Sequence, residues 1–579
     1  AVFLPIPLER TQTGEYTGSL FLVVTLTLLW SWILSLTMVP VLSFYLQKPR
    51  SKWEQKYGNA FYRGYRGLLS FCLRHRWGFT AFVILLTALA VWGFRLVPQM
   101  FFPPNERPIL TVELWQPYGT DIQVTAERAG KLSSIIRGDS EVEAAGSFVG
   151  YGGPRWYLPL EIEQASPNYA LLVLKCESQQ DLGPLKRRIQ RVADKRFPEA
   201  RVSVRRLERG PPVGAPIQIR LSGRDISVLY DLRDRVVERV RQAPGVTSVW
   251  DDWGKWSKKL VVDVDQHKAK RAGLSSEDIA SSLQSQYSGL MVTEYRQEED
   301  IIPIMARARE RTRRHLSRIR DLTVYSRSTE QRVPLGQVAR VRLDWQPSNI
   351  RRRDGERTMT VKADIRSGVY GVELLQNKIR PQLERLKDSP KWPAGYRMEY
   401  GGEFEKSREA NLAILYQVPI ALGLILLLLM LQFNSVRRVL VISLTLPPMF
   451  AGVTAGLLLT HSPFGFMALL GVISLLGILV NHGIVMLDQI ERERAQREPG
   501  QALIQAAQRR LRPILLTAAT TILGLLPLSL QGGELWRPLA NALIFGLGFS
   551  TLLTLLWCPV LYSLFFRVPA PDKQQISQE

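Results

Sequence analysis

The sequence predicts an α-helical polytopic membrane protein that carries a large α+β domain outside the membrane. Seven apolar runs, almost free of charge, are each long enough to cross a bilayer: residues 17–46, 77–97, 411–432, 438–460, 466–488, 513–531 and 538–566. By contrast, residues 98–408 have the charged composition of an ordinary globular domain. The hydrophobic content of 46% averages these two populations.

The net charge of +23 could indicate a nucleic-acid partner. Much of this charge lies in alternate short loops, for example at Arg509, Arg510 and Arg512. Such a distribution follows the positive-inside rule, so we expect no nucleic-acid binding. The rule places loops 47–76, 433–437 and 489–512 and the C-terminus in the cytoplasm, and residues 98–408 outside it.

The first element, residues 1–46, reads as the end of a membrane bundle that starts upstream. AVFLPIPLE has the composition of a remnant helix, and residues 17–46 form one full span. Two short Pro motifs recur late in the chain: Leu4-Pro5 at Leu526-Pro527, and Pro40-Val41-Leu42 at Pro559-Val560-Leu561. Parallel internal repeats are common in transporters, so this repeat predicts a missing N-terminal half.

Residues 47–76 follow as a cytoplasmic segment. Within it, residues 48–71 place aromatic and basic side chains at the spacing of an amphipathic helix lying on the membrane surface. A transmembrane helix at 77–97 then leads through the Pro-rich exit VPQMFFPPNERP into the outer domain.

The outer domain, 98–408, alternates strand-like with helix-like stretches. Strands are expected at 109–115, 141–150, 170–176 and 202–207, with helices at 120–136 and 181–197. The pattern restarts with PIQIRLSG, the helix 225–242, VTSVWDD and KLVVDVD, and again with TMTVKADI, the helix 371–387 and YRMEYGG. Repeated β-α-β modules are therefore predicted.

Residues 265–340 break this pattern and are interpreted as an inserted docking module. We expect a helix to begin at Ser275 or Ser276, and a strand pair within EQRVPLGQVARVRL. The charged helical stretch 403–411 should run directly into the membrane, where residues 409–566 form a five-helix bundle before a cytoplasmic tail at 567–579.

The bundle contains a polar cluster within FMALLGVISLLGILVNHGIVMLDQI. Asn481 and Asp488 share a helical face, whereas His482 is turned away from it. Thr517, and with it Thr520 and Thr521, could face this cluster from the next span. Polar groups at such depth often mark an ion path, although simple hydrogen bonding between helices is the alternative.

No catalytic or metal site is indicated. The sequence has no P-loop, nucleophile elbow or HExxH motif, and only five His. We therefore expect a transporter with no cofactor, driven by an ion gradient, and not an enzyme. Met291, Met305, Met359 and Met398 could in principle bind Cu(I), but their scatter favours core packing.

The outer segment SFVGYGGPRWYLPL is the candidate substrate site. It alternates aromatic residues with glycines, which is typical of a mobile loop that repacks around varied amphiphiles. Its candidate binding residues are Phe148, Tyr151, Arg155, Trp156 and Tyr157. A hairpin with ordinary core aromatics is the alternative.

Taken together, these residues resemble the C-terminal half of a resistance-nodulation-division efflux permease of the hydrophobe/amphiphile (acriflavin-resistance type) group. The resemblance covers essentially the whole chain. It includes MFFPPNERP, VPLGQVA and LQFNSVRR, and most specifically GILVNHGIVMLD and LRPILLTAATTILGLLPL.

The resemblance implies a proton-driven, homotrimeric antiporter in the bacterial inner membrane. Its β-α-β modules would be porter modules in the periplasm, and its partners a periplasmic adaptor and an outer-membrane channel. Asn481-His482 would stand at a proton-relay position that is Lys or Asn-Asn in the family. Arg510, Arg512 and Thr517 match positions near the proton exit, and 147–157 matches a switch loop between substrate pockets. The family's acidic pair would lie in the missing half.

Three interpretations remain open. The favoured one is half of a proton-coupled multidrug or amphiphile exporter. The second keeps the fold for heavy-metal export, which clustered Met pairs along the pathway would favour. The third is a truncated, non-transporting scaffold subunit.

Overall fold

The computed structural model describes residues 12–46, 60–161, 163–179, 182–309 and 316–569. Their contacts separate the chain into two compact units. The first consists of Ala1–Gln116, Thr120–Asp252 and Arg351–Glu579, and the second of Pro117–Gly119 and Trp253–Ile350.

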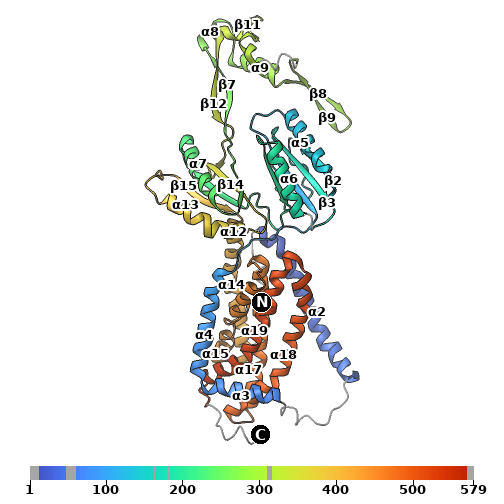
Figure 1. Cartoon of the computed structure of the whole chain (residues 1–579), viewed down its shortest axis with the longest axis vertical. Coiled ribbons are helices and arrows are strands. Elements are labelled where there is room, and N and C mark those ends of the chain that lie inside the picture. Colours follow the sequence, from blue (N-terminus) through green and yellow to red (C-terminus); the bar gives the residue numbers. More distant parts are fainter. Residues whose placement is uncertain (1–11, 47–59, 162, 180–181, 310–315, 570–579) are drawn as a thin grey trace. The chain divides into compact units, whose positions relative to one another are not determined.

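Helices dominate one part of the first unit. Within the described residues, seven helical segments are long and apolar enough to cross a membrane, as the sequence predicts. They are formed by α2 (Gln12–Leu46), α4 (Arg76–Gly93), α14 (Glu403–Phe433), α15 (Val436–Leu444) with α16 (Met449–Leu459), α17 (Phe466–Arg494), α18 (Pro499–Gln531) and α19 (Gly533–Phe565). Helix α19 contacts α16, α17 and α18 and so lies at the centre of the bundle (Figure 1).

The bundle leaves a large apolar surface uncovered. In the apolar window of α19, 61% of the residues are buried, against 11% in α18 and none in α2. The uncovered faces of α2 and α18 are therefore available to lipid or to further helices.

Two details of the bundle differ from expectation. The span expected over 438–460 is split between α15 and α16, because Pro447 and Pro448 cannot donate backbone hydrogen bonds to the preceding turn. The connection expected over 489–512 is mostly helical, since α17 continues to Arg494 and α18 begins at Pro499.

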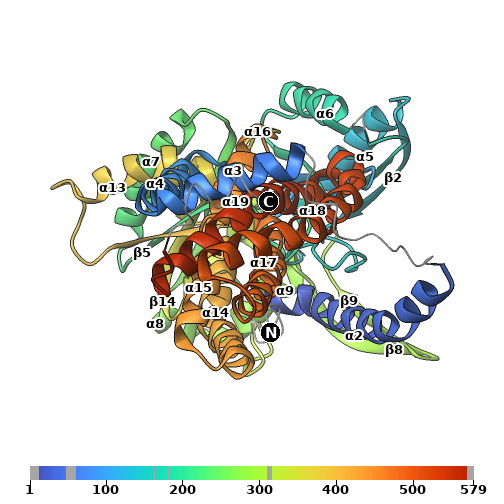
Figure 2. The ribbon, with the colours of Figure 1, turned by 90° about the horizontal axis from the view of Figure 1, so that it is seen from below.

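Helix α3 (Ala60–Arg74) lies against α18 and α19 (Figure 2). Leu69 and Cys72 of this helix are buried, and its Tyr65 hydroxyl donates a hydrogen bond to the Leu555 carbonyl of α19 at 2.9 Å. The second half of the expected amphipathic segment is thus helical, whereas residues 48–59 lie outside the described residues.

The first sheet has the order β2-β3-β1-β4, with all pairings antiparallel. Its strands are β1 (Ile109–Trp115), β2 (Val142–Val149), β3 (Tyr169–Cys176) and β4 (Arg201–Arg206). Helices α5 (Ile122–Arg137) and α6 (Leu182–Arg196) pack on the face that carries Leu110, Val112 and Leu114. Every expected element of this module is confirmed.

The second sheet has the order β13-β14-β5-β15, and β6 also pairs with β14. Its strands are β5 (Ile217–Ser222), β6 (Val246–Asp251), β13 (Arg352–Arg353), β14 (Glu356–Ile365) and β15 (Arg397–Gly402). Helix α7 (Ile226–Gln242) packs on it. The helix expected over 371–387 contains a π-helical segment, η4 (Leu375–Ile379), between α12 (Gly371–Leu374) and α13 (Arg380–Lys387).

Strand β15 passes directly into α14, as the charged stretch after residue 402 predicts. The first turn of this helix is tied to the second sheet by a bidentate ion pair. Arg220, on β5, donates from its Nη1 and Nη2 atoms to the two carboxylate oxygens of Glu405, at 2.8 and 2.5 Å. This pair therefore joins the start of α14 to β5 of the second sheet.

The second unit is built on the ribbon of β7 (Trp256–Val264) and β12 (Ala339–Pro347). Helices α8 (Gln266–Arg271) and α9 (Ser276–Tyr287) follow β7, and Ser275 caps α9 through a reciprocal capping box with Asp278, as expected. The hairpin of β8 (Leu290–Gln297) and β9 (Asp300–Ala306) comes next in the chain. Segments η3 (Leu316–Asp321), β10 (Thr323–Tyr325), β11 (Arg332–Pro334) and α11 (Leu335–Val338) complete the unit.

Two expectations for this unit are wrong. EQRVPLGQVARVRL does not form a strand pair, because α11 separates β11 from β12 and these strands pair with β10 and β7 respectively. Met291 and Met305 are not core residues, since they face each other across the hairpin with 55% and 50% of their surface exposed. Met359 and Met398 are buried, as expected.

Candidate functional site

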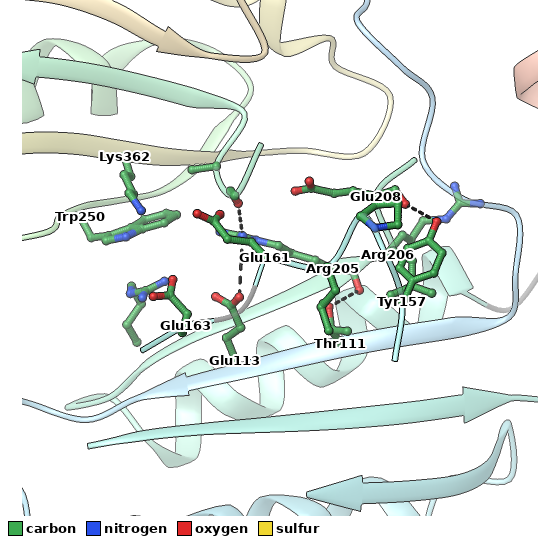
Figure 3. Close-up of a pocket in the computed structure, with 16 residues that line it drawn as sticks. Thr111, Glu113, Tyr157, Glu161, Glu163, Arg205, Arg206, Glu208, Trp250 and Lys362 are labelled. Carbon is green, nitrogen blue, oxygen red and sulfur yellow. Dashed lines mark hydrogen bonds and ion pairs between the residues drawn. The ribbon is translucent and has the colours of Figure 1, made fainter. Parts of the chain in front are cut away.

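Two sets of residues are candidates for function, and both lie in the first unit. One set lines a cavity between the two sheets, and the other consists of polar side chains in the helical bundle. The cavity has an empty volume of about 570 Å³, including space open to solvent (Figure 3).

Alternation along the strands creates the cavity wall. In the first sheet, the apolar residues of β1 and β4 turn towards α5 and α6, which leaves Thr111, Glu113 and Arg205 on the opposite face. Trp250 on β6 and Lys362 on β14 line the cavity from the second sheet. The two sheets therefore meet through their polar faces.

The link between the sheets is an ion pair between Arg205 and Asp364. The Arg205 Nη2 lies 2.9 Å from Oδ1 of Asp364, whose other oxygen accepts a hydrogen bond from Ser203 at 2.5 Å. Figure 3 shows Arg205 reaching towards Glu113, at 4.0 Å. Burial tends to lower the pKa of Arg205, but the carboxylates of Asp364 and Glu113 outweigh it and raise the pKa above its usual value.

Arg201 is held between two indole rings in the same cavity. Its guanidinium carbon lies 4.3 Å from the ring centre of Trp250 and 5.4 Å from that of Trp115. Its Nη1 is buried and has no hydrogen-bond partner among the described residues. Burial lowers the pKa of Arg201, so nearby carboxylates do not fully compensate its charge.

Carboxylates occupy another part of the wall. Burial raises the pKa of Glu163, and the neighbouring Glu113 raises it further. Burial also raises the pKa of Glu208, although its carboxylate accepts a hydrogen bond from the Val213 amide at 2.9 Å. The negative charges of Glu163 and Glu208 are therefore only partly compensated by their surroundings.

The aromatic loop at 147–157 contributes one residue to this cavity. Tyr157 lines it, and the Tyr157 hydroxyl donates to the Glu208 carbonyl at 2.7 Å while accepting from the Asn105 amide at 2.6 Å. Phe148 packs edge-on against Tyr151 with ring centres 5.8 Å apart. Arg155 donates to the Leu158 carbonyl at 2.6 Å.

The structure thus separates the five predicted binding residues. Tyr157 reaches the cavity, Trp156 stacks obliquely beside it with 39% of its surface exposed, and Phe148, Tyr151 and Arg155 are not among the lining residues. The roles of these residues in binding stay predictions.

In the bundle, the polar residues expected to form a relay lie on different surfaces. Asn481 on α17 and Thr517 on α18 are exposed, and the Thr517 hydroxyl donates to the Pro513 carbonyl of its own helix at 2.9 Å. His482 is only 3% exposed, and neither ring nitrogen has a hydrogen-bond partner among the described residues. His482 therefore points away from the Asn481 face, as the helical spacing predicts.

The remaining predicted relay residues lie at the end of the bundle where α17 meets α18. Asp488 forms an ion pair with Arg492, one turn along the same helix, at 3.0 Å. Arg510 is half-buried and Arg512 is exposed. No hydrogen bond joins these residues to Asn481 or Thr517 among the described residues, so the relay is still a prediction.

Sequence reasoning missed the ion-pair network at this end. Arg438 binds both carboxylate oxygens of Glu491, at 3.1 and 2.9 Å, and the Tyr562 hydroxyl donates to the same group at 2.7 Å. Glu493 is 2% exposed and pairs with Arg509 at 2.7 Å. The spacing of acidic and basic residues at the ends of α17 and α18 was the available signal.

This architecture is the fold of a resistance-nodulation-division permease. A solved structure of a heavy metal efflux pump, in its second crystal form, matches with a TM-score of 0.74 and 22% identity. The match covers 98% of this chain and 57% of that chain. This likeness shows that the two chains share a fold.

The chain belongs to the AcrB/AcrD/AcrF family, whose sequence model matches residues 1–566. It is 27% identical to the cobalt-zinc-cadmium resistance protein CzcA of Cupriavidus metallidurans, over 98% of this chain and 54% of that protein. It is 24% identical to the multidrug resistance protein MdtC of Pantoea ananatis, over 99% of this chain and 56% of that protein. The chain spans about half the length of the curated relatives that it matches.

Proposed function

We propose that this chain is the C-terminal half of a proton-driven efflux transporter that exports organic amphiphiles across the bacterial inner membrane. Membership of the permease family supports transport. The half-length match to the relatives supports a requirement for an N-terminal half. The mature assembly would be a homotrimer that works with a periplasmic adaptor and an outer-membrane channel, with residues 98–408 in the periplasm.

The choice of organic amphiphiles as the substrate class is based on the residues that line the cavity. It combines the aromatic rings of Trp250 and Tyr157 with charged side chains, and its described lining residues include no Cys, His or Met. Within the described residues, no group of three or more His, Cys, Asp or Glu could hold a metal ion. Soft and borderline metals select sulfur and imidazole ligands, whereas an organic amphiphile is bound by aromatic surface with a few polar groups.

Heavy-metal export is the second candidate. It is favoured by the names of two relatives, the cobalt-zinc-cadmium resistance protein and the nickel-cobalt-cadmium resistance protein NccA of Alcaligenes xylosoxydans xylosoxydans. A non-transporting scaffold subunit is the third, and it predicts assembly without export.

Energy would come from a proton relay built at Asn481, His482, Asp488, Thr517, Arg510 and Arg512. The exposure of Asn481 and Thr517 supports this proposal, because polar side chains are costly when they face lipid. Exposed polar side chains on α17 and on α18, in a chain about half as long as its relatives, suit the docking of further helices. Protons would then reach Asn481 from the docked half.

The test is export by the assembled transporter. The chain would be produced together with its N-terminal half in cells that lack other efflux pumps, and efflux of a cationic rhodamine ester would be compared with tolerance of cobalt and zinc. Dye efflux that an uncoupler abolishes is the expected result. Metal tolerance without dye efflux would favour the second candidate. Assembly without either would overturn the transport proposal.

A further inference from the structure

The cavity contains a cation and an anion that do not pair with each other. Arg201, at the start of β4, has a buried Nη1 without a hydrogen-bond partner among the described residues. Its guanidinium lies over the rings of Trp115 and Trp250, and these contacts satisfy none of its N–H groups. An arginine in this state is a ready donor for a carboxylate or another planar anion.

Glu163 is the matching anion. It lines the same cavity, and no hydrogen bond or ion pair joins its carboxylate to another described residue. Figure 3 shows Glu163, Glu113 and Glu161 among the residues that line the cavity together with Trp250. Among the charged groups, Glu113 has the largest effect on the pKa of Glu163, and this neighbouring carboxylate raises it further.

The nearby ions do not remove this imbalance. Arg205 is committed to Asp364 at 2.9 Å, and its backbone neighbour Arg206 lies 3.8 Å from Glu534. Arg201 and Glu163 are within electrostatic range of each other but form no ion pair, because their nitrogen and oxygen atoms are more than 4.0 Å apart. Both residues are partly buried, and the Arg201 Nη1 is fully buried. Removing these charges from water without an ion-pair partner is unfavourable, and a ligand that supplies both opposite charges would relieve it.

We propose that the cavity selects zwitterionic aromatic amphiphiles, with the ligand's anionic group on Arg201, its cationic group on Glu163 and its aromatic body against Trp250. This inference rests on the proposed function, because it names the substrate class of the same cavity. A metal cation or a purely cationic dye leaves the Arg201 guanidinium without an anion. A purely anionic ligand leaves Glu163 without a cation.

A carboxylate-bearing rhodamine and its methyl ester provide the matched probes. They share one aromatic ring system and one cationic centre, and they differ only in the carboxylate. Fluorescein serves as the anionic probe on a similar ring. Binding to the purified full chain in detergent would be measured by fluorescence polarisation, and export by the chain assembled with its N-terminal half would be measured separately.

The chain should bind the carboxylate rhodamine about tenfold more tightly than its ester, because one charge-assisted hydrogen bond is typically worth such a factor. Arg201→Gln should abolish this preference by weakening only the carboxylate form. Glu163→Gln should weaken both rhodamines and leave fluorescein unchanged. Arg191→Gln is the control, since Arg191 is exposed on α6 and donates only to the Arg187 carbonyl.

Equal affinity for the acid and the ester would overturn the inference, and so would an equal loss for both in Arg201→Gln, which would mark Arg201 as a structural residue. Export without any charge preference would leave the proposed function standing and reject the inference. Charge-selective binding without export would support the inference about the ligand and reject the proposed transport function. The two proposals can therefore fail separately.

Discussion

The ion pair between the two sheets offers the most direct test of how the cavity is built. Asp364 lies on β14 of the second sheet, and its carboxylate contacts Arg205 and Ser203 of β4 in the first sheet. Asp364→Asn keeps the shape of the side chain and its ability to accept a hydrogen bond. It removes the negative charge and replaces one of the two acceptor oxygens, which face Arg205 and Ser203, by a donor NH2 group.

The expected cost follows from burial. The Arg205 and Asp364 side chains are 17% and 14% exposed, so this pair is largely shielded from water. Breaking a buried pair by removing one partner typically costs about 3–5 kcal/mol, because the other charge is left uncompensated. Glu113, at 4.0 Å, still offsets part of the Arg205 charge, so we expect a loss of about 2 kcal/mol in the free energy of unfolding.

The assay is denaturant-induced unfolding in detergent, followed by tryptophan fluorescence. The ring centre of Trp250, one of 14 tryptophans in the chain, lies 5.6 Å from the Arg205 guanidinium carbon, so this contact contributes to the measured signal. Glu143→Gln provides the control. It breaks the exposed pair with Lys175, whose side chains are 58% and 50% exposed, and should cost under about 0.5 kcal/mol.

Two results would refute this reasoning. The first is a loss in Asp364→Asn no larger than that in Glu143→Gln, which would mean that the contact between the sheets is solvated. The second is strict additivity in the double variant Asp364→Asn with Arg205→Gln, because residues in direct contact should show coupling.

Three further predictions use the same unfolding measurement. Gly153→Ala should destabilise the chain by at least about 1 kcal/mol more than Gly355→Ala. Both glycines have positive φ, +74° and +81°, but only at Gly153 would the new methyl group meet a ring, at 2.9 Å; equal losses would contradict this. Glu493→Gln should cost about 3 kcal/mol, because this carboxylate is buried between arginines, whereas Asp488→Asn should cost under about 1 kcal/mol. A larger loss of stability in Asp488→Asn than in Glu493→Gln would contradict this expectation. Burial raises the pKa of Glu208, so the folded chain keeps a proton that the unfolded chain releases, and stability should fall as the pH rises above about 4.3. Glu208→Gln should reduce that slope, and an unchanged slope would show that Glu208 does not contribute to it.

The elements of the outer domain could be predicted because their hydrophobic patterns are simple. ILTVELW alternates apolar and polar residues, and the structure places β1 at Ile109–Trp115. The start of α9 follows from the capping sequence at Ser275. The break at Pro447 and Pro448 was visible in the sequence, but the continuous apolar run around these residues concealed it.

The cavity could not be predicted in the same way. Glu113, Arg201 and Arg205 occupy strand positions that ordinarily face water, and nothing local indicates that a second sheet covers them. Their partners Trp250 and Asp364 are distant in sequence, and only the tertiary fold brings them together. The aromatic loop carried a stronger local signal, yet it supplies only Tyr157 to the cavity lining.

The alternation along β1 and β4 has a consequence for how this protein can change. Leu110, Val112 and Leu114 hold the helices in place, while the intervening Thr111 and Glu113 line the cavity. On β1, the residues that pack against the helices and the residues that line the cavity thus alternate, whereas Arg205 on β4 both lines the cavity and joins the two sheets. Replacements at the cavity-facing positions of β1 leave the helix-facing core unchanged, so a library randomised only at Thr111 and Glu113 should retain a high fraction of folded members.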